Sequence, residues 1–512
     1  MSHLPVLPIL IPLVAGAVLF LTGGRGATRD RAIGLTATVA SLAVCLLLLA
    51  GSLDGEVRTY YVGDWPAPFG ITLVVDRLSA LMLCLTAALG LGSLLYAVGG
   101  DDRRSGHFHG LFQMQLLGIN GAFLTGDLFN LFVFFEILLI ASYALQLHGG
   151  GRKRVRAALH LVALNLVGSS IFLIGIGAVY AATGTLNLAD LTLRVAAAGA
   201  EQAGLLRAGG LLLLLVFALK AALVPLGFWL PPAYGSAAPP VAALFAIMTK
   251  VGVYAILRVH GLVFGPDAGP AALLALPWLV PVGLATIAAA TLGVLASSDL
   301  QRLLAYLVVL SAGTLITALG LGSDSAVSAA LFYTLNSTLV GGALFLLAGL
   351  IAEERGAAGG ALDRAQRVVR PALLGAMFFL GAIAVAGLPP LAGFAAKLYI
   401  LQSALGHPAA AWVLGLILVS GLLVIAALSR AGSAIFWRTG ETAALAEASG
   451  ARVKSLSAAL LLLGTVALMI GAGPTTAFTQ AAAAQLGDRD GYVMAVMANR
   501  GVSTPASERG RP

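Results

Sequence analysis

The chain has 512 residues, of which 59% are hydrophobic and only 10% are charged. This composition is typical of polytopic membrane proteins and excludes an ordinary soluble domain. The net charge of +8 could indicate a nucleic-acid ligand, but the basic residues lie mainly in loops between apolar segments, which argues against one.

Fourteen apolar segments are long enough to cross a membrane, which takes about 20 residues in a helix. We therefore predict an all-α polytopic membrane protein. The segments lie at residues 4–23, 31–53, 72–98, 109–125, 127–148, 158–182, 205–229, 239–260, 273–296, 303–321, 327–351, 372–400, 410–436 and 456–473. Beyond residue 474 the tail is polar and rich in Gly and Ala, and we expect it to be poorly ordered.

Basic residues are divided unequally between two sets of loops. Loops after odd-numbered segments hold eighteen of them, whereas loops after even-numbered segments hold five, with Arg258 among the five. Loops rich in Lys and Arg stay in the cytoplasm. Both termini are therefore predicted on the outer side of a bacterial cell membrane.

Lysines are rare and unusually placed. Only five of the thirty basic residues are lysines, and Lys220, Lys250 and Lys397 lie inside apolar segments. A lysine at the centre of a bilayer costs about 2.5–3.5 kcal/mol. Because a buried lysine, unlike arginine, can lose its proton, the three residues indicate proton translocation.

One carboxylate, Glu136, lies in the middle of an apolar segment, and its candidate partners are Lys220 and Lys250. An ion pair between buried groups favours the charged form of both, and its separation favours neutral forms. A pair that forms and breaks would thus act as a proton switch. The alternative is a static ion pair that fixes helix packing.

Prolines interrupt two segments beside buried lysines. Pro225 follows Lys220 by five residues, and Pro389 and Pro390 precede Lys397. A proline inside a helix frees backbone carbonyls, which a membrane tolerates only where protein or water surrounds them. Broken helices beside a charge are typical of ion sites in transporters; kinks that serve packing alone are the alternative.

The two broken segments, the seventh and the twelfth, each take fourth place in a group of five. Because five is odd, consecutive groups must have opposite orientation, which predicts inverted repeats of helices 4–8 and 9–13. The predicted regions are 1–108 with the first three helices, 109–260 and 261–437 with the repeats, and 438–512 with helix 14 and the tail.

Polar residues in these segments are candidates for carrying protons or a cation. His260, Ser311, Tyr333 and Asn336 are candidate relay residues, and ordinary interhelical hydrogen bonds are the alternative for each. Asp127 is a candidate sodium ligand because it is acidic and near membrane depth. The two isolated cysteines and the absence of a Cys/His cluster or a GxGxxG motif predict no cofactor.

Five motifs follow one another along the chain: FFEILLIASYAL, LKAALVPLGFWLPPAY, MTKVGVYAILR, SDLQRLLAYLVVLSAG and AGLPPLAGFAAKLYIL. Through them the chain resembles the antiporter-like subunits shared by Mrp-type Na+/H+ antiporters and respiratory complex I. The resemblance implies a fold of fourteen helices with two inverted repeats. It also implies a proton route through Glu136, Lys220, Lys250 and Lys397, other subunits of a hetero-oligomeric complex as partners, and H+ and Na+ as transported ions.

Within that family the resemblance favours the D-type branch of the Mrp antiporter subunits. Many relatives have histidines where this chain has Gly227 and Tyr234, and Lys397 differs from the complex I subunit that has glutamate in the twelfth helix. We therefore expect a secondary transporter subunit and not an enzyme. The alternatives are a proton-pumping subunit of a complex I-type NADH:quinone oxidoreductase or membrane-bound hydrogenase, and a packing scaffold with static ion pairs.

Overall fold

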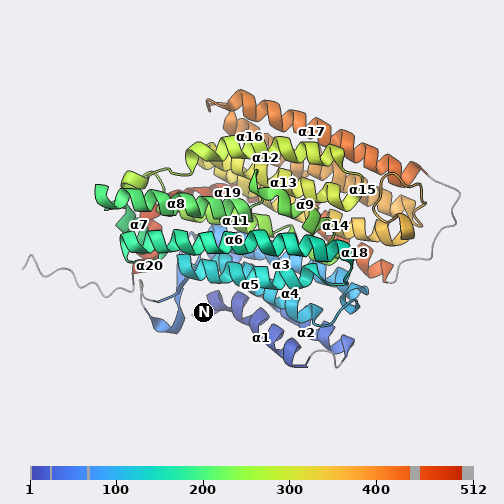
Figure 1. Cartoon of the computed structure of the whole chain (residues 1–512), viewed down its shortest axis with the longest axis horizontal. Coiled ribbons are helices and arrows are strands. Elements are labelled where there is room, and N and C mark those ends of the chain that lie inside the picture. The colour runs from blue at the N-terminus through green and yellow to red at the C-terminus, as the bar shows by residue number, and fades with distance from the viewer. Residues whose placement is uncertain (1–2, 23–25, 66–69, 439–449, 499–512) are drawn as a thin grey trace, which may run out of the picture.

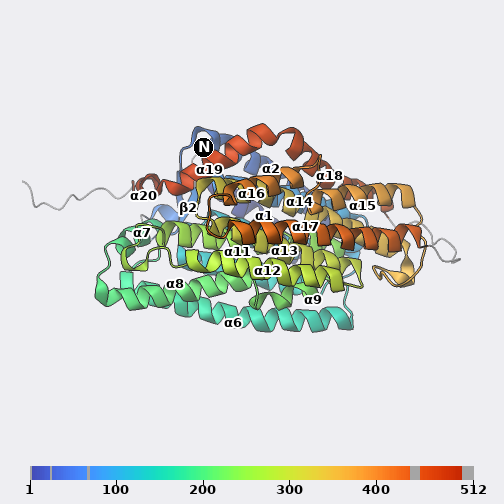
Figure 2. The same cartoon turned by 90° about the horizontal axis from the view of Figure 1, so that it is seen from above.

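The computed structural model describes residues 3–22, 26–65, 70–438 and 450–498. Long helices run nearly parallel to the longest axis of the molecule (Figures 1 and 2). Among the described residues, 12 helical segments are long and apolar enough to cross a membrane. The other two predicted spans are the 17-residue helix α4 (Phe108–Leu124) and the broken pair α15 (Pro371–Ala386) and α16 (Ala392–Ala404). The fold is therefore that of a multi-pass, mainly helical membrane protein, as predicted.

The N-terminal region contains three spans and a small β-hairpin that the sequence did not predict. Its elements are η1 (Leu4–Val6), α1 (Leu7–Thr22), α2 (Ala27–Gly51), η2 (Ser52–Asp54), β1 (Arg58–Tyr61), η3 (Val62–Asp64), β2 (Thr72–Val75), α3 (Arg77–Val98) and η4 (Asp101–Arg103). The strands pair antiparallel, with Arg58 opposite Val75. The prediction of a helix from residue 72 is wrong here, because the β-branched residues of β2 favour a strand and Asp76 caps α3 by accepting from the Ser79 amide at 2.8 Å.

The first group of five spans follows α3. Its elements are α4, α5 (Leu128–Gln146), α6 (Arg152–Thr183), the connecting α7 (Leu188–Ala196), α8 (Ala200–Lys220) with η5 (Leu226–Trp229) and α9 (Leu230–Tyr234), and α10 (Pro239–Phe245) with α11 (Met248–Ala255) and the π-helix η6 (Ile256–Val263). The break predicted at Pro225 lies between α8 and η5. The fourth span of this group therefore consists of the 21-residue α8 and, after the break, the short η5 and α9, whereas the fifth is built from three short helices.

The second group of five spans begins at the opposite end of the molecule from the first (Figure 1). Its elements are η7 (Gly269–Ala271), α12 (Leu276–Ala296), α13 (Leu300–Gly320), α14 (Asp324–Glu354), η8 (Gly356–Ala358), α15 with α16, and α17 (Ala410–Gly432) with the π-helix η9 (Ser433–Trp437). The break at Pro389 and Pro390 separates α15 from α16. The opposite starting ends agree with the predicted inversion.

The C-terminal region is more ordered than the sequence predicts. The last span, α18 (Ala451–Ile470), is followed by α19 (Ala472–Gly487) and α20 (Arg489–Met497). The prediction of a poorly ordered tail is therefore wrong as far as residue 498, because alanine is the best helix former and α19 buries Thr479, Ala482 and Ala483. Residues 499–512, the rest of the predicted tail, lie outside the described part of the chain.

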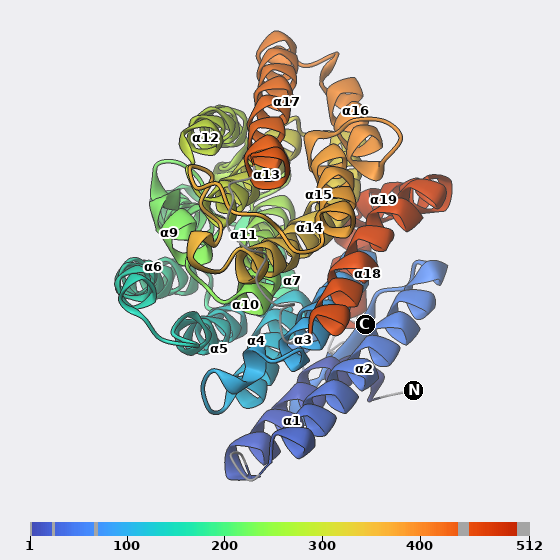
Figure 3. The same ribbon diagram turned by 90° about the vertical axis from the view of Figure 1, so that its right-hand side faces the viewer.

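The two ends of the bundle differ. One end carries the β-hairpin, α7 and α20, and we call it the hairpin end (Figure 1). Both η1 and α20 pack against β1, so the first and last described elements lie together there. The opposite end, which we call the basic end, carries the loops that are rich in Arg. Figure 3 views the molecule from the basic end, with α1 and α2 at one edge, α16 and α17 at the other, and α11, α13 and α14 between them.

Two of the basic residues counted above in loops, Arg258 and Lys454, are buried in ion pairs. Arg258 lies in η6 and pairs with the Asp76 carboxylate at 2.6 Å, with both side chains 4% exposed. Lys454 of α18 is 3% exposed and lies 2.7 Å from carboxylates of both Asp101 and Glu353. Their charge is neutralised within the protein, so neither contributes to loop charge as the sequence count assumed.

Candidate functional site: a row of buried lysines

Lys220 is held at a helix break. It is the last residue of α8, and its side chain is buried. The helix stops because Ala222 takes a left-handed conformation, with φ at 57°, and because Pro225 cannot donate a backbone hydrogen bond. Side chains satisfy the backbone groups at this break: the Trp229 indole donates to the Leu219 carbonyl at 3.0 Å, and the Val224 amide donates to the Thr286 hydroxyl at 3.0 Å.

Glu136 and Lys220 are linked through α6 and not by a direct ion pair. Among the described residues, no carboxylate oxygen lies within 4.0 Å of the Lys220 ammonium. The ammonium donates to the side-chain oxygen of Asn165 at 3.2 Å, and the Ser169 hydroxyl donates to the Glu136 carboxylate. Asn165 and Ser169 are one helical turn apart on α6. The same ammonium lies 5.9 Å from the centre of the Phe135 ring.

Asn165 and Ser169 are site residues that the sequence analysis did not identify. Both are polar residues inside the apolar segment 158–182, and their spacing of four places them on one helix face. That pattern is a usable signal. The two residues do not stand out in the sequence because single Asn and Ser residues in membrane helices usually serve only packing.

Lys250 lies in α11 at the centre of the bundle and is 1% exposed. Its ammonium donates to the Ser311 hydroxyl of α13 at 2.8 Å, so the structure brings one candidate relay residue into contact with a buried lysine. Two residues further on, Gly252 lies against the end of α8, where a Cβ atom would come within 2.5 Å of the Ala221 amide nitrogen. This close approach brings the helix of Lys250 against the backbone of Lys220.

Lys397 lies beyond the second break. It belongs to α16, is 9% exposed, and donates at 2.7 Å to the carbonyl of Ala386, the last residue of α15. The Asn336 amide, from α14, lies 3.5 Å from the Ala384 carbonyl in the last turn of α15. An ammonium is favourable at this negative end of a helix dipole. Lys397 follows the break in its span, whereas Lys220 precedes the break in its own. The two lysines therefore lie in equivalent spans of the two repeats but not at equivalent positions.

The remaining relay candidates lie in two different places. Tyr333 is buried on α14, a helix that packs against both α13 and α16. His260 lies in η6, ten residues after Lys250, which is about 15 Å along a helix. Its Nε2 atom lies 3.0 Å from the Gly210 carbonyl. His260 is thus near the hairpin end and apart from the lysines.

Asp127 serves as a helix cap. Its carboxylate accepts from the Asn130 amide at 2.8 Å, at the start of α5. Burial raises the pKa of Asp127 to about 6, although hydrogen bonds from the Asn130 and Phe129 amides act in the opposite direction. Within the described ranges, no group of three or more His, Cys, Asp or Glu side chains is arranged to hold a metal ion. The role of Asp127 as a sodium ligand stays a prediction.

Comparison with known proteins places this arrangement in a family. Residues 125–426 match the family described as NADH:quinone oxidoreductase/Mrp antiporter, transmembrane region. The chain belongs to this family. The matched residues include both breaks, Glu136 and all three buried lysines.

Several relatives are similar over nearly their whole length. The chain is 43% identical to the D subunit of a probable K+/H+ antiporter of Rhizobium meliloti, with 95% of this chain and 96% of the relative covered. It is 36% identical to the D subunit of the Na+/H+ antiporter of Bacillus subtilis, over 97% of this chain and 100% of the relative. It is 37% identical to the N subunit of the NADH-quinone oxidoreductase of Desulforudis audaxviator, over 83% and 84%.

A solved structure shares the fold. A chain in the structure of the Mrp complex from Dietzia sp. superposes with a TM-score of 0.86 at 28% identity, covering 97% of this chain and 100% of that one. The resemblance inferred from the five motifs is therefore confirmed at the level of the family and the fold.

Proposed function

We propose that the chain is the proton-translocating, D-type subunit of a multisubunit monovalent cation/proton antiporter, in which it assembles with other membrane subunits. The family supports this, as do the names of the relatives that match over nearly the full chain. The relatives are named for Na+ and for K+, so the shared activity is exchange of a monovalent cation for protons. Na+ remains our expectation for this chain.

The observation that carries the proposal is the environment of the three buried lysines. Lys220 donates to an amide oxygen, Lys250 to a hydroxyl and Lys397 to a backbone carbonyl. In the described chain none of these ammonium groups lies within 4.0 Å of a carboxylate. A static ion pair would neutralise a lysine permanently, whereas a neutral partner can bind both the charged and the neutral amine. The three residues are therefore suited to take up and release protons.

In this proposal a proton resides on Lys220 or Lys250 and moves toward Lys397. Gly252 allows the backbones at Lys220 and Lys250 to come close together, and the polar residues of α13 and α14 lie on the route from Lys250 to Lys397. The Glu136 carboxylate stabilises the charged form of Lys220 when the two groups approach, and this stabilisation is lost when they separate. Asn165 and Ser169 hold the two groups apart in the present conformation.

The test is cation-dependent proton transport in everted membrane vesicles that contain the whole complex. Glu136→Ala and Lys220→Ala are each expected to lower the initial rate at least tenfold at an unchanged amount of assembled complex. Lys153→Ala, which removes an exposed lysine, is the matched control. Full activity in both variants would refute the role of this pair.

The second candidate function is proton pumping inside a redox complex. It is favoured by the relative named as the N subunit of an NADH-quinone oxidoreductase. The two functions predict different neighbours, because a redox complex must contain subunits that carry electrons. Purification of the intact complex followed by mass spectrometry decides between them. Subunits with flavin or Fe–S sites would favour the second function, and further antiporter subunits would favour the first.

A further inference from the structure

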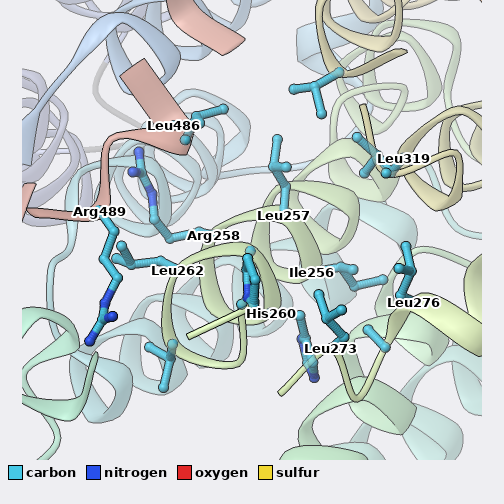
Figure 4. A pocket seen from close by; sticks show the side chains of 18 of the residues that line it. Ile256, Leu257, Arg258, His260, Leu262, Leu273, Leu276, Leu319, Leu486 and Arg489 are labelled. Carbon is cyan, nitrogen blue, oxygen red and sulfur yellow. The ribbon is translucent and has the colours of Figure 1, made fainter. Parts of the chain in front are cut away.

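A cavity of about 300 Å³ lies at the hairpin end of the bundle. Its walls come from η6, from the loop that leads to α12, from the facing ends of α13 and α14, and from α19 and α20. Figure 4 shows His260, Arg258 and Arg489 among its lining side chains. The C-terminal helices thus form one wall of a chamber that opens toward the hairpin side of the membrane.

A second, much smaller chamber of about 20 Å³ lies beside Lys250. A cavity needs about 10–15 Å³ to hold one water molecule and must offer polar partners. Thr334 of α14 and Lys250 itself line this chamber. Its volume would suffice for one water, but the Lys250 amine and the Tyr254 and Thr334 hydroxyls already donate to Ser311, Phe123 and Ala330. The chamber is therefore an apolar space that reaches Lys250.

Two leucines lie between the chambers, because Leu257 of η6 and Leu319 of α13 line both of them. Figure 4 labels both side chains in the larger cavity. The position of the two leucines relative to Lys250 follows from helix periodicity. Leu257 is seven residues after Lys250, and Leu319 is eight residues after Ser311, so each leucine lies about two turns beyond the Lys250–Ser311 hydrogen bond on its own helix.

The properties of these two leucines suit a gate. Leu319 is 7% exposed and offers no hydrogen-bond partner to water. A short apolar constriction blocks conduction because water leaves it. Leu257 lies in a π-helical segment, a geometry that is found mostly at functional sites. On the wider side, His260 lines the cavity, and its Nε2 atom lies 3.0 Å from the Gly210 carbonyl.

We propose that the larger cavity is the vestibule through which Lys250 exchanges protons with the water on the hairpin side, and that Leu257 and Leu319 form its gate. The species that passes is a proton carried by water. Charged side chains of both signs line the vestibule, namely Arg258, Arg489, Asp267 and Asp324, and the Lys250 amine lies behind the gate. This proposal rests on the proposed role of Lys250 in proton transfer, and it adds the side from which that residue is reached.

The experiment measures access directly. In the assembled complex, with Cys45→Ala and Cys84→Ala as background, single cysteines are placed in the vestibule (Leu276→Cys) and behind the gate (Thr334→Cys). Silver ions are added to one side of the membrane, and the thiols that remain free are quantified with a fluorescent maleimide after denaturation. Each cysteine is examined with the native gate, with Leu319→Ala and with Leu307→Ala. Leu307 is the control because it is a buried leucine of the same helix that lines neither chamber.

The proposal predicts that Leu276→Cys reacts rapidly from the hairpin side in every background. Thr334→Cys is expected to react slowly with the native gate, at least tenfold faster with Leu319→Ala, and slowly with Leu307→Ala. Leu257→Ala provides a second opened gate if Leu319→Ala reduces the amount of complex. Equal reaction rates of Thr334→Cys in all backgrounds, or faster reaction from the basic side, would overturn the proposal. This experiment measures thiol reactivity and not transport. A negative result would therefore reject the gate, whereas the proposed antiporter function is tested separately by transport in vesicles.

Discussion

At the scale of single residues, the central feature is that the buried Lys220 amine and the half-buried Glu136 carboxylate are kept apart by neutral groups. Asn165 accepts from Lys220, and Ser169 donates to Glu136, so α6 supplies one neutral partner to each member of the expected pair. A hydrogen bond to a charged group contributes about 1.5–3 kcal/mol, which is enough to hold this arrangement without making it permanent. The transient pairing that we propose for Glu136 and Lys220 requires these two hydrogen bonds to open.

Asn165→Asp is expected to inhibit transport, because it replaces the neutral partner of Lys220 with a carboxylate and creates a permanent buried ion pair. We expect the rate of cation-dependent proton transport in vesicles to fall at least tenfold. Asn165→Ser, which keeps a neutral oxygen, should retain a larger share of the activity. If Asn165→Asp transports as fast as the unmodified complex, then a neutral partner at this position is unimportant.

The sequence identifies the charged members of the site and misses their partners. A lysine or glutamate stands out in an apolar run because its burial is costly, so Glu136, Lys220, Lys250 and Lys397 could be selected without a structure. Asn165 and Ser169 could not, since their importance depends on which helices lie next to α6. The burial of Arg258 was missed for the same reason: its partner, Asp76, is distant in sequence and lies at the start of a different helix.

At the scale of helices and strands, close backbone contacts position the lysines. Gly252 lets α11 approach the end of α8, and Gly393 lets α16 approach the end of α15, where a Cβ atom would come within 1.8 Å of the Ala384 carbonyl oxygen. Such contacts explain why the two breaks keep a defined geometry. They depend on the packing of separate helices, so the sequence predicts the breaks through their prolines but not the contacts across them.

Gly252→Ala is expected to destabilise the protein, since its Cβ atom would lie 2.5 Å from the Ala221 nitrogen and 2.9 Å from the Lys220 carbonyl carbon. Overpacking of this kind costs about 1–3 kcal/mol. We expect a lower midpoint of thermal unfolding in detergent, together with reduced transport. Gly177→Ala on α6 is the control, because a Cβ atom there would meet nothing within 4 Å. Equal unfolding midpoints for the two variants would show that α11 can move away from α8 at little cost.

Two elements were wrongly predicted, each for a local reason. Residues 72–75 form an apolar run that joins a longer apolar segment, and a short apolar strand cannot be distinguished from helix by hydropathy alone. The region beyond residue 474 is polar and rich in Gly and Ala, which suggested disorder, but its helices pack on the bundle. There they become a wall of the vestibule, a role that only the tertiary arrangement reveals.

At the scale of the whole molecule, the two ends of the bundle have different tasks. The basic end contains ion-paired connections such as that of Lys454 with Asp101 and Glu353. The hairpin end contains the vestibule and both ends of the described chain. The positive-inside rule therefore predicts that the vestibule faces the outside of the cell.

This orientation can be tested with reporter fusions in intact cells. An enzyme reporter that is active only outside the cytoplasm should be active when it is attached after residue 498. It should be inactive when it is inserted in the loop before α6, beside Arg152. The opposite pattern would place the vestibule on the cytoplasmic side and reverse the proposed direction of proton entry.

The most direct test of the account is proton transport by the assembled complex carrying Lys250→Met, reconstituted in proteoliposomes. Methionine keeps an unbranched apolar side chain at the centre of the bundle but cannot carry a proton. The account predicts that the cation-driven proton flux falls to less than a tenth, with assembly and thermal stability preserved, whereas Lys153→Met keeps its full flux. Undiminished flux in Lys250→Met would contradict the central claim that the buried lysines carry the protons.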